Sequence, residues 1–189
     1  ARQVGKSWLM EEFGRQEYKA FFKFNFDKDE ELSALFRHSK DAHFLIEQLG
    51  ILAGQSIEPE KHLLIFDEIQ ECKEALNSLK YFKEDAPEHY VIAAGSLLGV
   101  ATKHKNEPED ESNNTFPVGK VSFLDMYPVT FREYLRMANL RLMEQMEARL
   151  AGLEPLPEIL FNQLTEHYRR YQVCGGLPKP CSEMLDGAG

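Results

Sequence analysis

Cysteine is scarce in this chain, with three residues, Cys72, Cys174 and Cys181, among 189. Their odd number and their spacing fit neither a zinc site nor a disulfide framework, so we expect three reduced thiols and a cytoplasmic protein. Cys72 and Cys174 have no neighbouring histidine that would suggest a catalytic nucleophile, and we interpret both as small residues near helix ends.

Long apolar runs are also missing. No hydrophobic segment approaches the ~20 residues that span a bilayer, and the first residues do not resemble a signal peptide, so we expect no membrane partner. The 43% hydrophobic and 28% charged residues are typical of a globular protein with one substantial core, or with a core and a small lobe.

Basic residues are outnumbered: 22 Lys and Arg face 31 Asp and Glu, for a net charge of −9. Binding of nucleic acid over a broad surface usually needs a basic face. The overall charge therefore does not support a nucleic-acid partner.

What the sequence does contain, at its start, is most of a phosphate-binding loop. Residues 1–7 (ARQVGKS) match x-x-x-x-G-K-[ST], a pattern whose backbone N–H groups wrap nucleotide phosphates while the lysine reaches the terminal ones and the hydroxyl binds Mg²⁺. The first glycine of the pattern and the strand before it are absent, so we expect a fragment of a longer protein with weakened nucleotide affinity. The expected nucleotide-binding residues are Gln3, Val4, Gly5, Lys6, Ser7 and Trp8.

Strand and helix patterns alternate after this loop, which predicts a parallel α/β sheet. The first helix is expected to stop at Gly14. The polar segment 103–115 predicts a solvated loop. Apolar patterns predict strands at residues 18–26, 62–68, 90–96 and 118–127, and helices at 29–38, 42–52 and 73–84.

The last part of the sequence is predicted to be helical, over residues 131–139, 140–151 and 158–173. Thr130 and Glu133 have the spacing of a capping box at the start of this region. A break at residues 175–178 follows, and then a tail without a strong pattern.

Two acids end the predicted strand at residues 62–68, at the edge where parallel sheets carry function. Asp67 is expected to hold Mg²⁺ together with Ser7, and Glu68 to deprotonate the attacking water, with Lys6 neutralising phosphate charge. Ser96, at the end of the next strand, could contact the γ-phosphate or that water, or could simply cap a helix. The predicted catalytic residues are Glu68, Lys6 and Ser96.

Other polar and aromatic residues remain open. Asn25 could hold Glu68 idle, and Gln70 could relay nucleotide state or be a surface residue. Trp8 and the phenylalanines of residues 21–26 suggest core packing rather than base stacking. Candidates for an arginine finger, each more simply a solvated or salt-bridged helix residue, are Arg132, Arg136, Arg169 and Arg170.

Together these segments resemble a family of bacterial and archaeal AAA-type ATPases that carry a C-terminal domain of uncharacterised function. The resemblance lies in residues 2–7 (RQVGKS), 65–70 (IFDEIQ), 94–96 (AGS), 127–135 (YPVTFREYL) and 171–178 (YQVCGGLP). Where the family often has Gly-Arg, this chain has Gly119 and Lys120; lysine keeps the charge and loses the fork geometry of arginine.

The resemblance implies a three-layer, parallel-sheet P-loop ATPase core whose first strand is missing, followed by a small helical lobe. We expect the truncated core at residues 1–128 and a lid-like lobe at 129–189, the start of a C-terminal region that is cut off. The implied cofactors are ATP and Mg²⁺. The implied partners are the missing C-terminal domain and a second copy or another protein.

Three functions fit these motifs to different degrees. The preferred one is ATP hydrolysis coupled to a C-terminal domain or partner. The alternative is a nucleotide-gated switch with little or no turnover, which the intact Glu68 disfavours. A helicase, suggested by Asp-Glu-x-Gln, would need a second motor domain and a basic track.

Overall fold

A computed structural model describes residues 3–95 and 119–186. Chain contacts divide the molecule into two compact units, one formed by Lys6–Leu124 and the other by Ala1–Gly5 with Asp125–Gly189. The predicted catalytic residue Ser96 and the polar loop at 103–115 lie outside the described residues.

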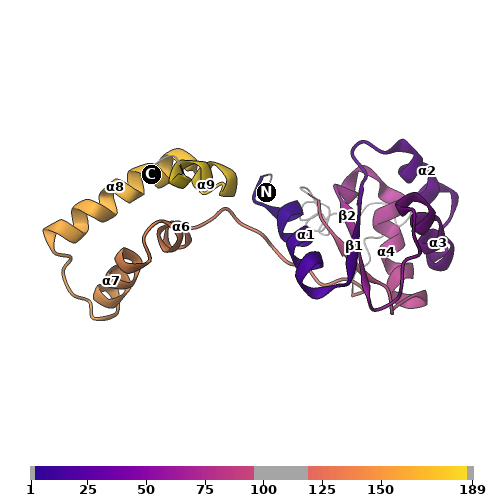
Figure 1. Ribbon diagram of the computed structural model, residues 1–189, viewed down its shortest axis with the longest axis horizontal. Coiled ribbons are helices and arrows are strands. Elements are labelled where there is room, and N and C mark those ends of the chain that lie inside the picture. The colour runs from indigo at the N-terminus through magenta and orange to yellow at the C-terminus, as the bar shows by residue number, and fades with distance from the viewer. Residues whose placement is uncertain (1–2, 96–118, 187–189) are drawn as a thin grey trace, which may run out of the picture. The chain divides into compact units, whose positions relative to one another are not determined.

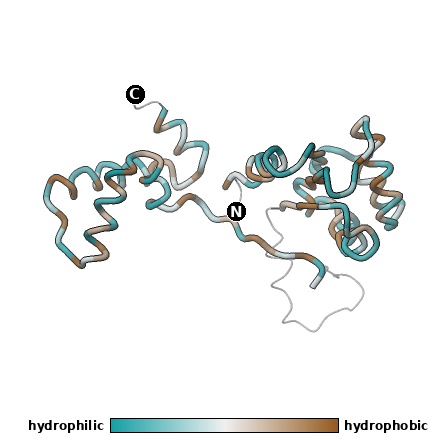
Figure 2. Tube along the Cα trace, turned by 60° about the horizontal axis from the view of Figure 1, so that its bottom comes forward, coloured by the Kyte–Doolittle hydropathy of each residue, from teal (hydrophilic) through white to brown (hydrophobic). Residues whose placement is uncertain are grey.

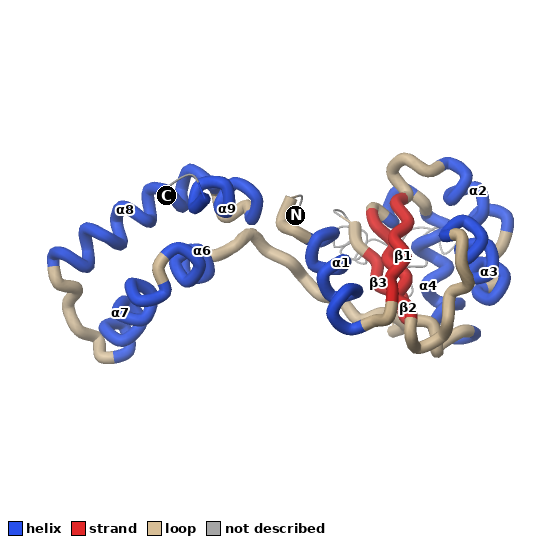
Figure 3. The backbone as a smooth tube through the Cα atoms, viewed as in Figure 1, coloured by secondary structure: helices blue, strands red, loops and turns tan. Residues whose placement is uncertain are grey.

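The larger unit contains a sheet of three parallel strands in the order β1-β2-β3 (Figure 3). The strands are β1 (Ala20–Asn25), β2 (His62–Asp67) and β3 (Tyr90–Ala93). In the register of the sheet, Asn25 lies opposite Asp67 and Phe66 lies opposite Ala93. The carboxyl ends of the strands therefore meet at one edge, as the sequence predicts.

Helices cover both faces of this sheet, with α1 on one side and α2, α3 and α4 on the other (Figure 1). On the α1 face, Met10 packs with Leu63 and Ile65. The opposite face has a larger aromatic core, in which Phe66 makes edge-to-face contacts with several phenylalanines. The expected three-layer α/β architecture is confirmed. Its helices are α1 (Lys6–Glu17), α2 (Glu30–His38), α3 (Ala42–Ala53), η1 (Ile69–Glu71) and α4 (Lys73–Asp85).

Helix α1 does not end at Gly14, as the sequence suggested, but continues to Glu17. Gly14 is buried, and a Cβ atom at this position would lie 2.9 Å from Cβ, Cγ and Cδ1 of Phe21 on β1. The glycine therefore permits the close approach of helix and strand instead of terminating the helix.

The predicted strand at 118–127 is absent from its described part, residues 119–127, which form a turn and an extended segment without sheet pairing. Phe123, Leu124 and Tyr127 are largely exposed there. Among the described strands, β3 pairs only with β2, so this apolar sequence has no adjacent ladder to join. Local strand propensity alone does not build a strand.

The second unit consists of helices α6 (Phe131–Ala138), α7 (Leu140–Ala151), α8 (Glu158–Cys174) and α9 (Pro178–Asp186). Hydrophobic and hydrophilic positions alternate along these helices, as they do in the larger unit (Figure 2). The first three helices follow the prediction, and Thr130 and Glu133 form the expected capping box at the start of α6. Helix α9 was not predicted, because Pro178 and Pro180 lower helix propensity; both lie in its first turn, where the N–H that proline lacks would have no intrahelical acceptor.

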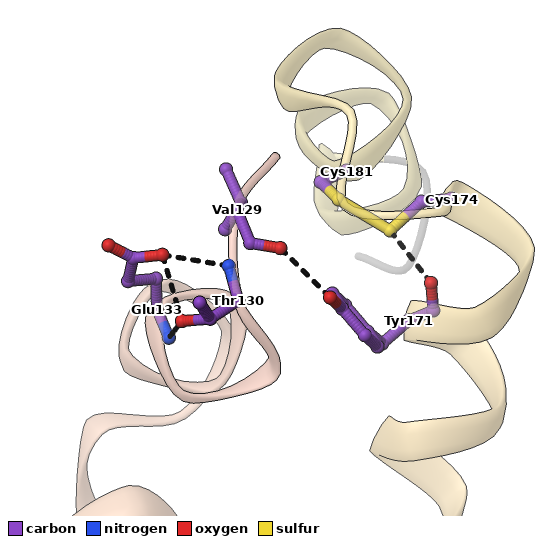
Figure 4. Close-up of a disulfide and its surroundings, with 6 residues drawn as sticks. All are labelled: Val129, Thr130, Glu133, Tyr171, Cys174 and Cys181. Carbon is purple, nitrogen blue, oxygen red and sulfur yellow. Dashed lines mark hydrogen bonds between the residues drawn. A yellow bond between two sulfur atoms is a disulfide. The ribbon is translucent and has the colours of Figure 1, made fainter. Parts of the chain in front are cut away.

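A close-up of this unit shows how the α8–α9 turn is held (Figure 4). The Tyr171 hydroxyl donates to the Val129 carbonyl at 2.9 Å, and the Val129 N–H donates to the Gly176 carbonyl at 2.7 Å. Cys174 and Cys181 are joined by a disulfide, with Cα atoms 5.3 Å apart. The expectation of three reduced thiols is therefore wrong for this pair, since the turn between the helices brings the cysteines together; Cys72 is free and buried.

Candidate functional site

The phosphate-loop residues lead directly into the first helix. Gly5 has a φ of 88°, in the left-handed region that favours glycine, and Gln3 has a φ of 60°. Val4 is buried. Lys6 and Ser7 are the first two residues of α1, whose leading N–H groups have no acceptor within the helix and so can bind an anion.

Trp8, the third residue of α1, is 65% exposed. The prediction that it packs in the core is therefore wrong, whereas Phe22, Phe24 and Phe26 are buried as predicted. Trp8 stays a predicted nucleotide-binding residue.

Ser7 and Asp67 form the central contact of the site. The Ser7 hydroxyl donates to Oδ2 of Asp67 at 2.7 Å across a sequence separation of 60 residues. Asp67, the last residue of β2, is only 3% exposed. The two residues predicted to bind the metal are thus neighbours, and each offers a hard oxygen.

A third side chain joins this pair. The Lys23 ammonium of β1 lies 3.1 Å from Oδ2 of Asp67 and 2.8 Å from Oε1 of Glu11 on α1. Partial burial works to lower the pKa of Lys23, but hydrogen bonds to Glu11 and Asp67 outweigh it and raise the pKa above its ordinary value. Lys23 is therefore a cation at neutral pH.

Backbone hydrogen bonds fix the turn after β2 to both neighbouring strands. The Phe26 N–H donates to the Asp67 carbonyl at 3.0 Å, and the Ile69 N–H donates to the Ala94 carbonyl at 3.0 Å. Between them, Glu68 has φ 51° and ψ 39°, a left-handed conformation that is uncommon for a residue with a side chain. The two anchors hold this conformation in place.

Glu68 is engaged by Gln70, whose Nε2 donates to Oε2 of Glu68 at 2.6 Å. The prediction that Asn25 contacts Glu68 is not met: Oδ1 of Asn25 accepts from the Asp27 N–H at 2.9 Å, in a local turn. Gln70 is thus the residue that restrains the expected base.

The residues present fit a Mg²⁺ ion. Over the ranges that the structure describes, no group of three or more His, Cys, Asp or Glu side chains could hold a metal by itself. Mg²⁺ needs no such group, because it binds through one or two protein oxygens and takes its other ligands from phosphates and water. The buried Asp67 carboxylate next to the Ser7 hydroxyl supplies those protein oxygens.

The basic residues considered as phosphate partners have local contacts. Arg132 pairs with Glu147, and Arg170 pairs with Glu166 at 2.6 Å, both within the helical unit. Lys120 pairs with Glu84 at 3.0 Å. Arg132 and Arg170 therefore form salt bridges, as the simpler interpretation expected; Arg136 and Arg169 remain candidates only.

Sequence reasoning missed Lys23 and undervalued Gln70. The signal for Lys23 was present: in the strand sequence FFKFN, alternation places the lysine on the face opposite Phe22 and Phe24, close to the functional edge of the sheet. For Gln70 no pattern could give its pairing with Glu68, since this depends on the left-handed turn at Glu68.

Comparison with known protein families identifies a match over most of the chain. The model of a family described as "AAA domain" matches residues 1–135. No curated protein and no solved structure matches the chain in the same comparisons. The matched span includes the loop, the contact between Ser7 and Asp67, and the start of the helical unit. The chain therefore belongs to the AAA domain family.

Proposed function

We propose that this protein binds ATP and hydrolyses it in a Mg²⁺-dependent reaction. The observation that carries the proposal is the 2.7 Å hydrogen bond between Ser7 and Asp67, which joins the phosphate-loop hydroxyl to the buried acid at the end of a central strand. Membership of the AAA domain family indicates a nucleotide-binding, ATPase-like function and supports the same conclusion.

Each residue of the site has a defined task in this reaction. The N–H groups at the start of α1 and the Lys6 ammonium bind the phosphates. Ser7 and Asp67 would hold Mg²⁺, which when bound neutralises charge on the β- and γ-phosphates.

Glu68 takes a proton from the water that attacks the γ-phosphorus, while the bond from that phosphorus to the β–γ bridging oxygen breaks and ADP leaves. A carboxylate next to the metal-holding acid can act as this general base when it comes within hydrogen-bond reach of the water. Ser96 is proposed to contact the γ-phosphate.

A nucleotide-gated switch is the second candidate, and the bond from Gln70 to Glu68 favours it. While a neighbouring amide restrains the base, the protein hydrolyses ATP slowly. Binding of nucleotide or of a partner would release the base. In this case the nucleotide state would be passed to a C-terminal domain or partner protein, through a lobe at residues 129–189.

Localisation in the cytoplasm is part of the proposal, because ATP and Mg²⁺ are abundant there. The cysteines do not support this compartment, since Cys174 and Cys181 are joined by a disulfide. Within the described ranges no helix is both long and apolar enough to cross a membrane.

The test is phosphate release and nucleotide binding by the protein and by Glu68→Gln. We expect turnover to fall by about 100-fold or more, while ATP binds with unchanged affinity. Glu31→Gln, an exposed acid on α2, is the matched control and should hydrolyse normally. Binding without turnover in every form would favour the switch, and absence of ATP binding would refute both functions.

A further inference from the structure

Lys23 and Ser7 both contact the same carboxylate oxygen of Asp67. Oδ2 of Asp67 accepts from the Ser7 hydroxyl at 2.7 Å and lies 3.1 Å from the Lys23 ammonium. The Asp67 side chain is 5% exposed, so this oxygen has little access to water. Lys23 therefore places a positive charge beside a buried carboxylate, which is costly to bury without a paired cation.

Lys23 is also held from its other side. Its ammonium lies 2.8 Å from Oε1 of Glu11, and the second oxygen of Glu11 accepts from Arg15 at 3.2 Å. Moving the ammonium away from Asp67 would thus leave it paired with Glu11. The lysine has two anionic partners, and only one of them is a proposed metal ligand.

We propose that Lys23 competes with Mg²⁺ for Asp67 and thereby sets the metal affinity of the site, an inference that rests on the proposed function. The Lys23 ammonium and Mg²⁺ both bind the buried carboxylate of Asp67. The ammonium is attached to the adjacent strand, so its effective concentration at Asp67 is high and does not change with the magnesium concentration in solution. Mg²⁺ must displace it toward Glu11.

Lys23 differs in this respect from Lys6. The phosphate-loop lysine favours binding of metal and nucleotide together, because it neutralises phosphate charge. Lys23 opposes metal binding, because it neutralises the protein ligand instead. The two lysines therefore have opposite effects on the same complex.

The experiment is a titration with Mn²⁺, a spectroscopic substitute for Mg²⁺, at saturating concentration of a non-hydrolysable ATP analogue. Electron paramagnetic resonance measures free Mn²⁺, and the same titration of the analogue without protein gives the Mn²⁺ that the analogue binds by itself. The difference gives the dissociation constant of the protein site without turnover. We expect about three- to tenfold tighter binding for Lys23→Met, as a partly exposed ion pair no longer has to be broken. Lys23→Arg keeps the charge and should bind as the unmodified protein does.

Lys19→Met is the matched control, because Lys19 precedes the same strand and pairs with Glu58 at 2.8 Å, away from Asp67. It should leave the Mn²⁺ affinity unchanged. Glu11→Gln gives a test in the opposite direction: without this carboxylate Lys23 stays at Asp67, and Mn²⁺ binding should weaken by about two- to fivefold. In the Lys23→Met background, Glu11→Gln should have no further effect.

Equal or weaker Mn²⁺ binding by Lys23→Met, in a protein whose thermal unfolding shows that it is folded, would overturn the competition. If Lys23→Met does not fold, Glu11→Gln decides: unchanged or tighter binding would overturn the proposal. Failure of every form to bind Mn²⁺ with the nucleotide would overturn the proposed function itself, and so differs from failure of the Lys23 role.

Discussion

Gln70 donates a 2.6 Å hydrogen bond from its amide to the carboxylate of Glu68, two residues earlier in the same turn. The same amide nitrogen lies 3.1 Å from Oε1 of Glu71. The side-chain oxygen of Gln70, Oε1, is buried and has no hydrogen-bond partner in the part of the chain that the structure describes. The amide nitrogen therefore binds the carboxylates of both Glu68 and Glu71, and its contact with Glu68 is the shorter.

Replacing Gln70 by alanine should raise basal ATP hydrolysis. The variant removes a hydrogen bond worth about 1 kcal/mol, so the fraction of Glu68 that is free to reach the water rises and kcat should increase about two- to fivefold. Nucleotide affinity should not change. Steady-state kinetics measure both, and Gln70→Ala combined with Glu68→Gln should be inactive. A lower kcat would show instead that Gln70 orients Glu68 for the reaction.

Gly14→Ala tests the close contact between α1 and β1. Alanine normally stabilises a helix interior by up to about 1 kcal/mol relative to glycine. Here the new Cβ would meet Phe21 at 2.9 Å, and overpacking costs about 1–3 kcal/mol. We expect a net loss of about 1–2 kcal/mol in the free energy of unfolding, measured by urea denaturation.

A shortened partner provides the control for this prediction. Cβ of Phe21 is one of the atoms at 2.9 Å, so the space beside Gly14 opens only in a Phe21→Gly background, where Gly14→Ala should become neutral or stabilising. An equal loss in both backgrounds would mean that the contact with Phe21 does not limit the size of this residue.

Gly14 also shows how far the sequence predicts the fold. Apart from η1 and α9, periodicity predicted the described helices and the three described strands, because amphipathic helices and buried strands have patterns that a single sequence displays. Periodicity could not predict that Gly14 packs against Phe21, since glycine both ends helices and allows close packing. Periodicity also predicted a strand at residues 118–127, which is absent from the described part of this segment. A strand needs a neighbouring strand to pair with as well as apolar residues.

For the site, the sequence was most informative about residues that belong to a motif. The pairing of Ser7 with Asp67 follows from a phosphate loop and an acid at the end of a buried strand. Lys23 belongs to no motif, and the Asp-Glu-x-Gln pattern that contains Gln70 does not give its contact with Glu68. The sheet register brings Lys23 within 3.1 Å of Asp67, and a left-handed turn brings Gln70 within 2.6 Å of Glu68. The prediction of reduced thiols was wrong for Cys174 and Cys181 for the same reason, because the spacing of cysteines along the sequence does not show which of them pair.

Two tyrosines in the helical unit should respond in opposite ways to loss of their hydroxyl groups. Tyr171 donates to the Val129 carbonyl at 2.9 Å, so Tyr171→Phe should lower the free energy of unfolding by about 1 kcal/mol. Burial raises the pKa of Tyr134, whose hydroxyl has no partner among the described residues. Tyr134→Phe should therefore be neutral or stabilising by up to about 1 kcal/mol.

Chemical denaturation followed by the near-ultraviolet circular dichroism of the remaining tyrosines measures both variants. The substitutions remove the same atom from helices of the same unit, so each serves as the control for the other. A loss of about 1 kcal/mol for Tyr134→Phe would show that its hydroxyl has a partner, for instance an ordered water.

The Cys174–Cys181 disulfide should stabilise the turn between α8 and α9. It closes a loop with a sequence separation of 7, for which the chain-entropy model gives about 2–3 kcal/mol. The Cys174→Ser/Cys181→Ser variant should therefore unfold at a temperature roughly 10 °C lower, measured by the near-ultraviolet circular dichroism of the aromatic residues. Dithiothreitol should lower the unfolding temperature of the unmodified protein by a similar amount and leave the double variant unchanged.

Cys72→Ser, which alters the free cysteine, should keep the full response to the reductant. An unmodified protein that does not respond to dithiothreitol, and unfolds at the same temperature as the double variant, would contradict the stabilising role of this bond.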